Sequence, residues 1–484
     1  MARGPFAWMD ATPLRRAIPA AVAVSVLGAL VSASAAQVVG ERAGDARPAK
    51  NPRSVPAPVV TPLVSVRRVA SAVTGWEAVS RVQRGVATLT TALPESACFV
   101  VEVHGRRAVD LRAGTALEPA SNAKLAVAHA ALARLGADHR FTTTVLGDVR
   151  AGAVEGDLWL VGGGDPVLVT APFRAREKYR TRFATPLEAL ADTVVAAGVR
   201  SVSGMVRGDG SRYDAERFAP GLPDGIRVVE VGPIGALLVN DGAVATSPLK
   251  PADPAAAAAE TFALLLAERG VRVAGGSGAG TTPNGGAGLA TVAEIRSAPL
   301  GDLVRDLLTN SDNDTAEMLL KEVGRAATGE GTRAAGIADA LSQVGAAGVP
   351  VAGLALSDGA GLHRDDRMSC DTAIGILDAA PPDGPLRSGL AVAARTGTLR
   401  DVEWPPAVGG TLRAKTGTLV GVKSLSGVYP TAAGGDATFS LMLNGPGSST
   451  VDVWGPLWTT LGLALDDAST VPAPVLLTPV SRRG

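Results

Sequence analysis

The sequence predicts a mixed α/β fold in which one antiparallel sheet takes strands from both ends of the chain. A strand-like run at residues 97–103 precedes a helix-like segment that begins at Ser121. Between residues 141 and 297, short strand-like runs alternate with glycine turns, which is typical of a β-rich insert. Two further strand-rich stretches, at residues 410–428 and 437–443, close the body. We therefore expect one split domain that carries one or two small inserted domains.

The first part of the split domain is expected to begin with a hairpin and a helix. Residues 97–103 form an apolar run typical of a buried strand, and residues 108–111 are its expected hairpin partner. The helix is predicted to begin at Ser121 and to end before Gly136, because glycine commonly follows helix ends. Its apolar residues fall on one helical face: Leu125, Ala128, Leu132 and Leu135.

The remaining elements belong to the insert and to the second part of the domain. In the insert we expect strands at 142–146, 158–161, 202–206 and 228–231, a helix at 255–268 and a glycine-rich loop at 275–288. Helices are also expected at 76–89, where the periodicity is weak, and at 300–308, 314–324 and 453–461. The expected division of the chain is a signal peptide or membrane anchor (1–40), a linker (41–75), the first part of the domain (76–140), the insert (141–297), the second part (298–470) and a free tail (471–484).

The N-terminus has the pattern of an export segment. Arg15 and Arg16 precede an uncharged, mostly apolar run at residues 17–40. Residues 33–35, Ala-Ser-Ala, offer a cleavage site, and the run is also long enough to stay in a membrane as an anchor. Residues 41–62 are rich in proline and charge and are interpreted as a linker. In both cases the bulk of the chain is expected outside the cytoplasm.

Composition excludes several classes of function. The chain has 484 residues, of which 46% are hydrophobic, so a sizeable core is possible. The formal net charge is zero and aromatic residues make up 4%, which argues against a nucleic-acid partner, because such partners require a basic footprint or stacking aromatics. No HExxH or other paired histidine spacing is present, so we expect neither a metal nor another cofactor.

The two cysteines, Cys98 and Cys370, allow two interpretations. In an oxidising compartment they can pair with each other. Alternatively they are two separate buried thiols, which the general tendency of cysteine to be buried favours. They are too few for a disulfide framework or for a four-cysteine zinc site.

Three short motifs carry the chemistry, and they stand in the order Ser121-Asn-Ala-Lys124, Ser311-Asp-Asn313 and Lys415-Thr-Gly417. A serine hydroxyl becomes a good nucleophile when a base takes its proton. Lys124 follows Ser121 by one helical turn and shares its face, so its amine can reach the hydroxyl. Burial and the positive charge of Lys415 would lower the pKa of Lys124 and make it a base, a role that arginine cannot take.

The same motifs supply groups that can bind a substrate. Acyl transfer needs two backbone N–H groups for the oxyanion, and we expect them from Ser121 and Thr418. Gly417 has no side chain to block the close approach of the strand edge. The hydroxyls of Thr416 and Thr418, with Lys415, suit a substrate carboxylate.

Ser311 and Asn313 are expected to relay the proton of the leaving group and to hold the substrate amide. Alternatively, one of these side chains only caps the helix that follows. A stretch at residues 395–398, Arg-Thr-Gly-Thr, nearly repeats the third motif. Lys415 is preferred because its flanks alternate like a strand, and Arg395 is interpreted as a loop residue.

Together these motifs resemble those of the D-alanyl-D-alanine carboxypeptidase/endopeptidase family, the class C penicillin-binding proteins of the S13 serine peptidases. The motif set itself is shared by penicillin-binding proteins and class A β-lactamases. Further stretches that resemble the family are residues 119–125, 164–166, 236–242, 316–317 and 414–419. The long gap between the first two motifs is similar to that of this family, in which it holds extra domains, whereas β-lactamases have a much shorter one.

The resemblance implies a transpeptidase/β-lactamase-like domain, an antiparallel sheet with helices on both faces, split by small β-rich domains. It implies a serine-type D-Ala-D-Ala carboxypeptidase that acts on peptidoglycan stem peptides through an acyl-enzyme, uses no metal and is inhibited by β-lactams. The implied catalytic residues are Ser121, Lys124, Ser311, Asn313 and Lys415. The implied substrate-binding residues are Thr416, Gly417 and Thr418.

Two stretches depart from the family pattern. Residues 358–364 read D-G-A-G-L-H-R where the family often has D-G-S-G-L-S-R, and residues 396–399 read T-G-T-L where it often has D-G-T-L. We interpret His363 as a solvated loop residue rather than a new polar contact, because an isolated histidine needs partners to act in catalysis.

Two other functions are compatible with these motifs. The first is a β-lactamase or esterase on the same machinery, although the sequence offers no recognisable base for fast hydrolysis of the acyl-enzyme. The second is a catalytically idle scaffold that binds the cell wall, against which the intact residues of all three motifs argue.

Overall fold

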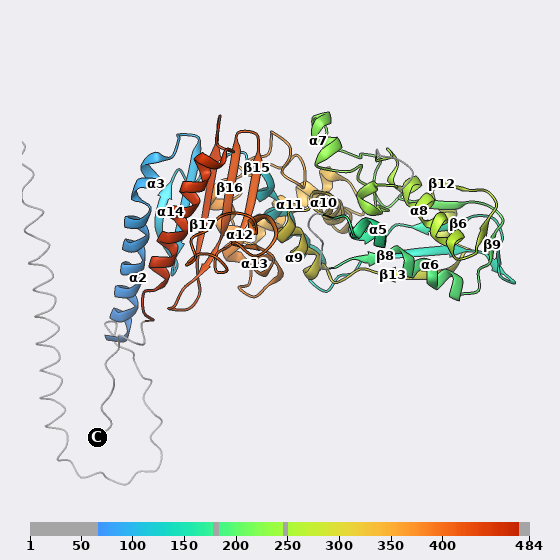
Figure 1. Cartoon of the computed structure of the whole chain (residues 1–484), viewed down its shortest axis with the longest axis horizontal. Helices are drawn as coiled ribbons and strands as arrows, with labels where there is room; N and C mark the ends of the chain where they lie inside the picture. The colour runs from blue at the N-terminus through green and yellow to red at the C-terminus, as the bar shows by residue number, and fades with distance from the viewer. Residues whose placement is uncertain (1–65, 178–182, 245–249, 474–484) are drawn as a thin grey trace, which may run out of the picture. The chain divides into compact units, whose positions relative to one another are not determined.

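The computed structural model describes residues 66–177, 183–244 and 250–473. A six-stranded antiparallel sheet has the strand order β14-β15-β16-β17-β1-β2 (Figure 1). Its strands are β1 (Ala97–Val103), β2 (Arg106–Leu111), β14 (Ala391–Val392), β15 (Arg413–Leu419), β16 (Val422–Pro430) and β17 (Asp436–Asn444). β1 pairs with β17 along its whole length, which confirms that strands from the two ends of the chain share one sheet.

Helices cover both faces of this sheet. Phe99 and Val101 of β1 pack with one helical layer, whereas Cys98 and Val100 pack with the other. A strand that is buried on both faces reads as a continuous apolar run, which explains the sequence of β1. The first layer contains α2 (Val66–Gly85), α3 (Ala87–Ala92) and α14 (Val451–Ser469). The second contains α4 (Ala123–Leu135), α9 (Leu300–Asn310), α10 (Asn313–Thr328), α11 (Arg333–Ala346), α12 (Cys370–Ala379) and α13 (Pro385–Ser388). The predicted fold class is therefore confirmed.

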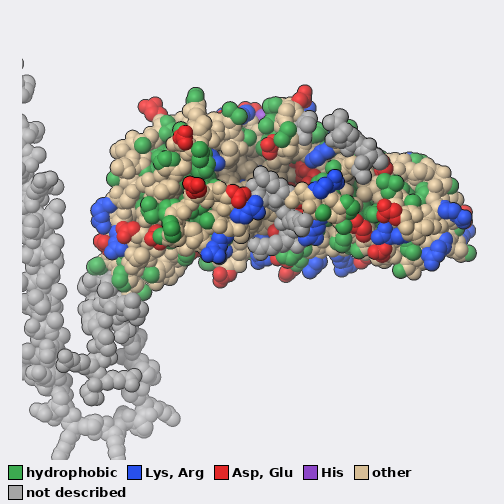
Figure 2. Space-filling view, viewed as in Figure 1, with side chains coloured by type: hydrophobic (Ala, Val, Ile, Leu, Met, Phe, Trp, Pro, Cys, Tyr) green, Lys and Arg blue, Asp and Glu red, His purple; other side chains and the backbone are tan. Residues whose placement is uncertain are grey.

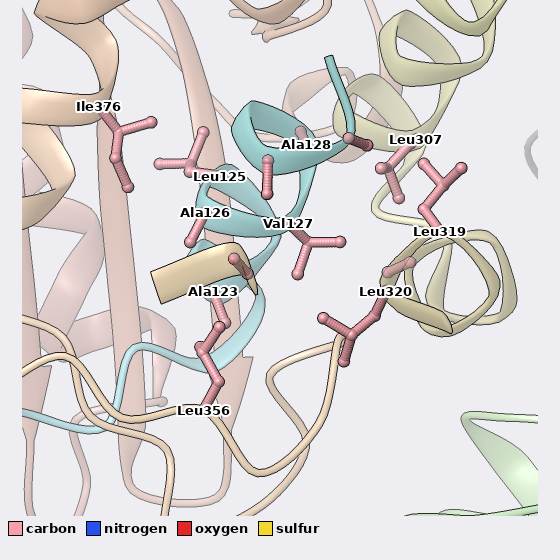
Figure 3. Close-up of a cluster of buried hydrophobic side chains, with 14 of the residues drawn as sticks. Ala123, Leu125, Ala126, Val127, Ala128, Leu307, Leu319, Leu320, Leu356 and Ile376 are labelled. Atoms are coloured by element: carbon pink, nitrogen blue, oxygen red, sulfur yellow. The ribbon is translucent and has the colours of Figure 1, made fainter. Parts of the chain in front are cut away.

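Helix α4 is buried on nearly all sides, which differs from the predicted single apolar face. It begins at Ala123, after a 3-10 turn at Ala120–Asn122, and every residue from Ala123 to Ala128 is buried. Figure 3 shows side chains of α9, α10 and α12 around it. Its many alanines leave room for these helices on faces that the periodicity assigned to solvent.

Residues 142–296 form sheets of their own. A five-stranded sheet has the order β12-β10-β6-β3-β13, a four-stranded sheet the order β11-β9-β5-β4, and β7 pairs with β8. The strands are β3 (Thr142–Gly147), β4 (Val149–Arg150), β5 (Ala153–Val154), β6 (Leu158–Val161), β7 (Leu168–Val169), β8 (Thr185–Pro186), β9 (Ser201–Val202), β10 (Val206–Asp209), β11 (Arg272–Val273), β12 (Ser277–Ala279) and β13 (Ala290–Arg296). The helices are α5 (Ala171–Arg174), α6 (Leu187–Ala196), α7 (Asp224–Val229) and α8 (Pro254–Glu268). A separate hydrophobic cluster, which includes Val145, Leu160 and Phe262, packs these sheets against α6 and α8.

Several local expectations were wrong. The apolar run at 228–231 is not a strand, because α7 occupies residues up to Val229 and starts directly after Pro223, which is common before or at a helix start. The expected strand at 202–206 is divided between β9 and β10. Helix α2 begins at Val66, inside the expected linker, and its residues Val79 and Val82 pack in the same hydrophobic cluster as α14.

The ends of the chain are described only in part. The expected signal peptide or anchor at residues 1–40 lies outside the described residues, as do residues 474–484 of the expected tail. Val471, where that tail was expected to begin, is instead buried with α14. Among the residues that the structure describes, no helix combines the length and the apolar character needed to cross a bilayer.

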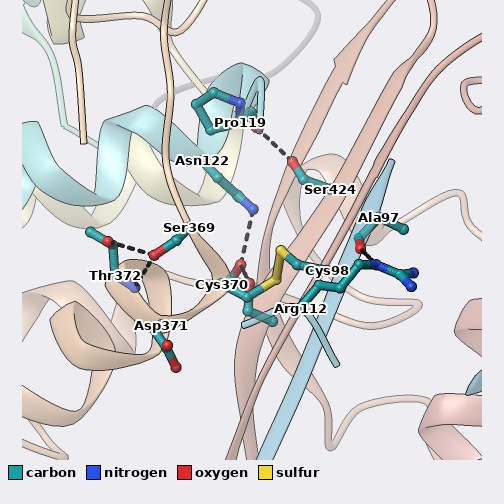
Figure 4. Close-up of a disulfide and its surroundings, with 12 residues drawn as sticks. Ala97, Cys98, Arg112, Pro119, Asn122, Ser369, Cys370, Asp371, Thr372 and Ser424 are labelled. Carbon is teal, nitrogen blue, oxygen red and sulfur yellow. Dashed lines mark hydrogen bonds between the residues drawn. A yellow bond between two sulfur atoms is a disulfide. The ribbon is translucent and has the colours of Figure 1, made fainter. Parts of the chain in front are cut away.

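Cys98 and Cys370 form a disulfide, so the preferred interpretation as separate thiols was wrong. The bond joins β1 to the first residue of α12 across the buried face of the sheet (Figure 4). The two cysteines lie 272 residues apart in the sequence, and this separation gave no sign that they meet in the fold.

Removing this disulfide is expected to lower the free energy of unfolding by about 2–4 kcal/mol, because the bond constrains a very long loop of the unfolded chain. The double variant Cys98→Ala/Cys370→Ala should unfold at a lower guanidinium concentration than the wild type under non-reducing conditions. With a reductant in both samples, the guanidinium concentrations at which half of each protein is unfolded should converge. Equal midpoints without reductant would contradict a stabilising bond.

Candidate active site

Ser121 lies in the 3-10 turn directly before α4, and β16 holds this turn in place. The hydroxyl of Ser424 donates a hydrogen bond to the carbonyl of Pro119 at 2.7 Å, and the Asn122 amide donates to the Ser426 hydroxyl at 3.0 Å (Figure 4). The position of the nucleophile therefore depends on the sheet as well as on the helix.

Two glycines allow the surrounding backbone to approach the turn closely. A Cβ atom on Gly417 would lie 2.6 Å from the carbonyl oxygen of Pro119 and 2.2 Å from the hydroxyl oxygen of Ser424. Gly361 has a φ of +77°, and a Cβ there would lie 2.0 Å from the carbonyl oxygen of Ala120. Both sites require glycine, because the atoms that a side chain would meet include fixed backbone.

The amine of Lys124 is buried and makes three polar contacts. Its Nζ atom lies 2.9 Å from Ser121 Oγ, 2.7 Å from Asn313 Oδ1 and 2.5 Å from the carbonyl oxygen of Ala360. Asn313 Nδ2 donates to the carbonyl of Glu230 at 2.6 Å, which turns its oxygen toward the lysine. A neutral amine can donate its two hydrogens to Asn313 and Ala360, so its lone pair faces the hydroxyl of Ser121.

Burial lowers the pKa of Lys124 to about 8, and the negative charge of Asp358, followed by that of Asp312, opposes this shift. The side chain has no exposed surface, so desolvation of the ammonium form is the dominant cause. A lysine with this pKa is suited to act as a base near neutral pH.

The rate at which benzylpenicillin acylates the protein is expected to rise with pH up to about 8. Only the neutral amine accepts the serine proton, and about a tenth of Lys124 is neutral one unit below its pKa. We therefore expect roughly a tenfold rise from pH 6 to pH 7 and a plateau above about pH 9, measured as the second-order rate constant by rapid quenching and intact-protein mass spectrometry. A rate constant that does not change between pH 6 and pH 8 would contradict this role of Lys124.

Lys415 of β15 is the second buried lysine of the site. Its Nζ donates to Ser311 Oγ at 2.8 Å and to the carbonyl of Thr416 at 2.7 Å. Burial, and then the positive charges of Lys124 and Lys423, hold the pKa of Lys415 well below its ordinary value. A substrate carboxylate beside it would favour the charged form again.

The second motif places Ser311 and Asn313 toward the two lysines. Ser311 ends α9 in the left-handed conformation with a φ of 63°. Asp312, and neither Ser311 nor Asn313, caps α10, because its carboxylate accepts the N–H of Thr315 at 2.6 Å. The alternative that one of these two side chains is the helix cap is therefore wrong.

The outer edge of β15 is open beside the third motif. β14 pairs only with Arg413 and Ala414, so within the described residues no strand covers the edge from Lys415 onward. Thr416 Oγ1 donates to Thr398 Oγ1 at 2.8 Å. Thr398 belongs to the near-copy of the third motif and was not predicted to reach the site. Arg395, which begins that near-copy, is exposed, as expected of a loop residue.

A buried carboxylate supports the loop that carries Ala360. Glu317 Oε1 accepts the N–H groups of Gly359 and Ala360 at 2.6 and 2.9 Å, and its Oε2 accepts from Arg333 at 3.0 Å. These bonds fix the carbonyl of Ala360 against Lys124. The contact with Lys124 uses the backbone carbonyl of residue 360, so it does not depend on the serine side chain that the family often has at this position.

His363 is a polar contact and not a solvated residue, which corrects the preferred interpretation. Its Nδ1 accepts the N–H of Asp365 at 3.1 Å, so Nε2 carries the hydrogen and donates to the carbonyl of Pro220 at 2.9 Å. The ring therefore ties the loop at 358–366 to the segment that leads into α7.

A cavity of about 450 Å³ adjoins the site. It is lined by Ser311 and Asn313 on one side and by residues of the 142–296 region, including Pro166 and Asp241, on the other.

On the side of the molecule in Figure 2, basic and acidic side chains are interspersed, whereas the lysines of the site are buried. In the part of the chain that the structure describes, no group of three or more His, Cys, Asp or Glu side chains is arranged to hold a metal.

Sequence reasoning missed the contacts made by Ala360, Glu230 and Thr398. Ala360 lies in a loop, Glu230 directly follows α7, and Thr398 lies in a short 3-10 turn at Gly397–Leu399. Ala360 and Glu230 act through backbone carbonyls, which the residue type does not reveal.

Comparison with known proteins gives consistent matches. The family model for the D-Ala-D-Ala carboxypeptidase 3 (S13) family matches residues 87–252 and 245–453. A D-alanyl-D-alanine carboxypeptidase of Actinomadura sp. (strain R39) is 32% identical over 414 residues, covering 69% of this chain and 74% of that protein. Carboxypeptidase DacB of Mycolicibacterium smegmatis is 31% identical over 460 residues, covering 91% and 95%. The crystal structure of penicillin-binding protein 4 from Haemophilus influenzae has the same fold, with a TM-score of 0.65 and 20% identity over 80% of this chain and 99% of that one.

Proposed function

Because the chain belongs to the D-Ala-D-Ala carboxypeptidase 3 (S13) family, it is a D-Ala-D-Ala carboxypeptidase. We propose that it is a serine-type carboxypeptidase/endopeptidase that binds penicillin, and that Ser121 is its nucleophile. The observation that carries this proposal is the 2.9 Å contact between Lys124 Nζ and Ser121 Oγ. Both remaining hydrogens of a neutral Lys124 have acceptors, so its lone pair is directed at the serine.

In the acylation step, Lys124 removes the proton of Ser121 and the serine oxygen attacks the carbonyl carbon of the penultimate D-alanine. The backbone N–H groups of Ser121 and Thr418 stabilise the oxyanion. Lys415, with the hydroxyls of Thr416 and Thr418, binds the carboxylate of the leaving residue. For this the Thr416 hydroxyl turns its hydrogen from Thr398 to the substrate, and Thr398 then donates to Thr416. This assignment rests on the open edge of β15 and on the burial of the Lys415 amine.

The peptide C–N bond then breaks, and the leaving amine needs a proton. Ser311 can pass one from Lys415, since the two are 2.8 Å apart, while Asn313 holds the substrate amide. The serine proton on Lys124 then replaces, through solvent, the proton that Lys415 gave up, so both lysines return to their starting states. Water hydrolyses the resulting ester at Ser121 with the neutral Lys124 as the base, and the proton taken from water returns to the serine. With a β-lactam, the leaving nitrogen stays tethered to the acyl group, which obstructs this second half of the cycle.

The full chain is expected to release D-alanine from a stem pentapeptide that ends in D-Ala-D-Ala, measured by chromatography of the products. Ser121→Ala should release none above background. A cross-linked peptide dimer in a parallel reaction separates carboxypeptidase from endopeptidase cleavage. Release by the Ser121→Ala variant at the wild-type rate would contradict the proposal.

An enzyme of peptidoglycan acts outside the cytoplasm, and we propose that residues 17–40 direct this chain there, either as a cleaved signal peptide or as a membrane anchor. The support is the pair Arg15 and Arg16 before an uncharged apolar run, and the Ala-Ser-Ala stretch at 33–35. N-terminal sequencing of the protein from the cell envelope distinguishes the two: a mature end near residue 36 indicates cleavage, and an end near residue 1 indicates an anchor.

We also propose that residues 141–297 are an insert into a split domain, whose parts were expected at 76–140 and 298–470 and which the structure begins with α2 and ends with α14. The separate sheets and the separate hydrophobic cluster of this region support the division. Contacts such as the ion pair between Arg212 and Glu322 join the insert to α10.

A further inference from the structure

Lys423 is a third buried lysine beside the third motif, and no motif includes it. It lies on β16 directly opposite Thr418 of β15, so the two side chains share one face of the sheet. Its Nζ donates to Thr418 Oγ1 at 3.0 Å, and only 9% of the residue is exposed.

Aromatic rings hold this ammonium in place. Nζ lies 4.2 Å from the ring centre of Trp454 and 4.9 Å from that of Trp458. Trp404 stacks on Trp458, with ring centres 6.0 Å apart. A cation over an indole face is attracted electrostatically without being neutralised. Within the described part of the chain, Lys423 forms no ion pair with a carboxylate, so its positive charge stays available to a ligand.

The contact with Lys423 determines how the hydroxyl of Thr418 can act. An ammonium donates hydrogens and accepts none, so Thr418 Oγ1 must be the acceptor of this bond. The hydroxyl hydrogen of Thr418 is then free to be donated to another group. That group would lie on the open edge of β15, where the third motif is placed to bind a carboxylate.

We propose that Lys423 is a positioning residue that fixes the Thr418 hydroxyl as a donor to the carboxylate of the leaving D-amino acid. Selectivity for substrates with a free carboxylate therefore depends on Lys423. This inference rests on the proposed function and assigns the part of the site that recognises the leaving residue. Burial lowers the pKa of Lys423 to about 8, which still leaves it mainly charged at pH 7.

The test gives the full-length protein two thioester substrates that share the same N-acyl-D-alanyl group and differ only in the leaving thiol. One has thioglycolate as the leaving group and so carries a carboxylate, and the other has ethanethiol, which carries none. The variant Lys423→Met keeps the apolar stem over the tryptophans and removes the charge. We expect its kcat/KM for the thioglycolate ester to fall about tenfold, mainly through KM, with little change for the ethyl thioester.

Two further variants separate positioning from packing. Lys423→Arg keeps a cation over the tryptophans and should restore most of the selectivity. In a Thr418→Val background, Lys423→Met should cause little additional loss, because the residue through which Lys423 acts is absent. An equal loss for both thioesters in Lys423→Met, or an undiminished effect of that substitution in the Thr418→Val background, would overturn the inference. Failure of the wild type to turn over either ester would instead contradict the proposed function and the inference with it.

Discussion

Replacing Lys124 with methionine is expected to slow the acylation of Ser121 by benzylpenicillin about 10³- to 10⁴-fold. The substitution removes the base that takes the serine proton, and general-base catalysis contributes about 10²- to 10⁴-fold in enzymes. The backbone N–H groups of Ser121 and Thr418 stay in place, so residual acylation should remain above that of Ser121→Ala. The measurement is the second-order rate constant for formation of the covalent adduct.

The control is Lys124→Arg, which keeps the positive charge but cannot accept a proton at neutral pH. It should be about as slow as the methionine variant, and thermal unfolding of both variants shows that they are folded. Acylation of Lys124→Arg at the wild-type rate would show that the charge, and not the basicity, of Lys124 matters.

Replacing Lys415 with alanine is expected to reduce acylation by benzylpenicillin about 10²- to 10³-fold. The variant loses the cation that faces the ligand carboxylate, and removing one partner of a buried charge pair costs about 2–5 kcal/mol. Ser311 also loses its 2.8 Å contact. The loss should appear both with penicillin and with a D-Ala-D-Ala peptide, measured as kcat/KM.

Arg395→Ala is the matched control, because Arg395 begins the near-copy of the third motif and is exposed. It should acylate within about twofold of the wild type, since surface substitutions usually have small effects. If Arg395→Ala slows acylation and Lys415→Ala does not, the third motif has been assigned to the wrong segment.

The sequence predicted the site better than it predicted the surroundings of the site. The spacing of Ser121 and Lys124 on one helical turn is a local property, so their contact follows from the motif alone. The meeting of Lys124 with Asn313, 189 residues away, depends on the packing of α4 against α10, and only the order of the motifs suggested it.

Other features had no local signal. The pairing of Cys98 with Cys370 requires that α12 begin beside β1, and nothing in either segment encodes this. α11 was not predicted because alanine and glycine blur its apolar periodicity, although Thr332 is a good N-cap. The apolar run at 228–231 matched a strand by composition, whereas the structure places its first two residues at the end of α7, which starts directly after Pro223.

Ser121 is tested most directly as the nucleophile by intact-protein mass spectrometry of the full chain after incubation with benzylpenicillin, with Ser121→Ala in parallel. We expect one stable adduct on the wild type, located on Ser121 by peptide mapping, and none on the variant. Rapid destruction of the drug without a lasting adduct would favour a β-lactamase. No adduct on the wild type with the drug left intact, or an equal adduct on Ser121→Ala, would contradict the claim that Ser121 is the nucleophile.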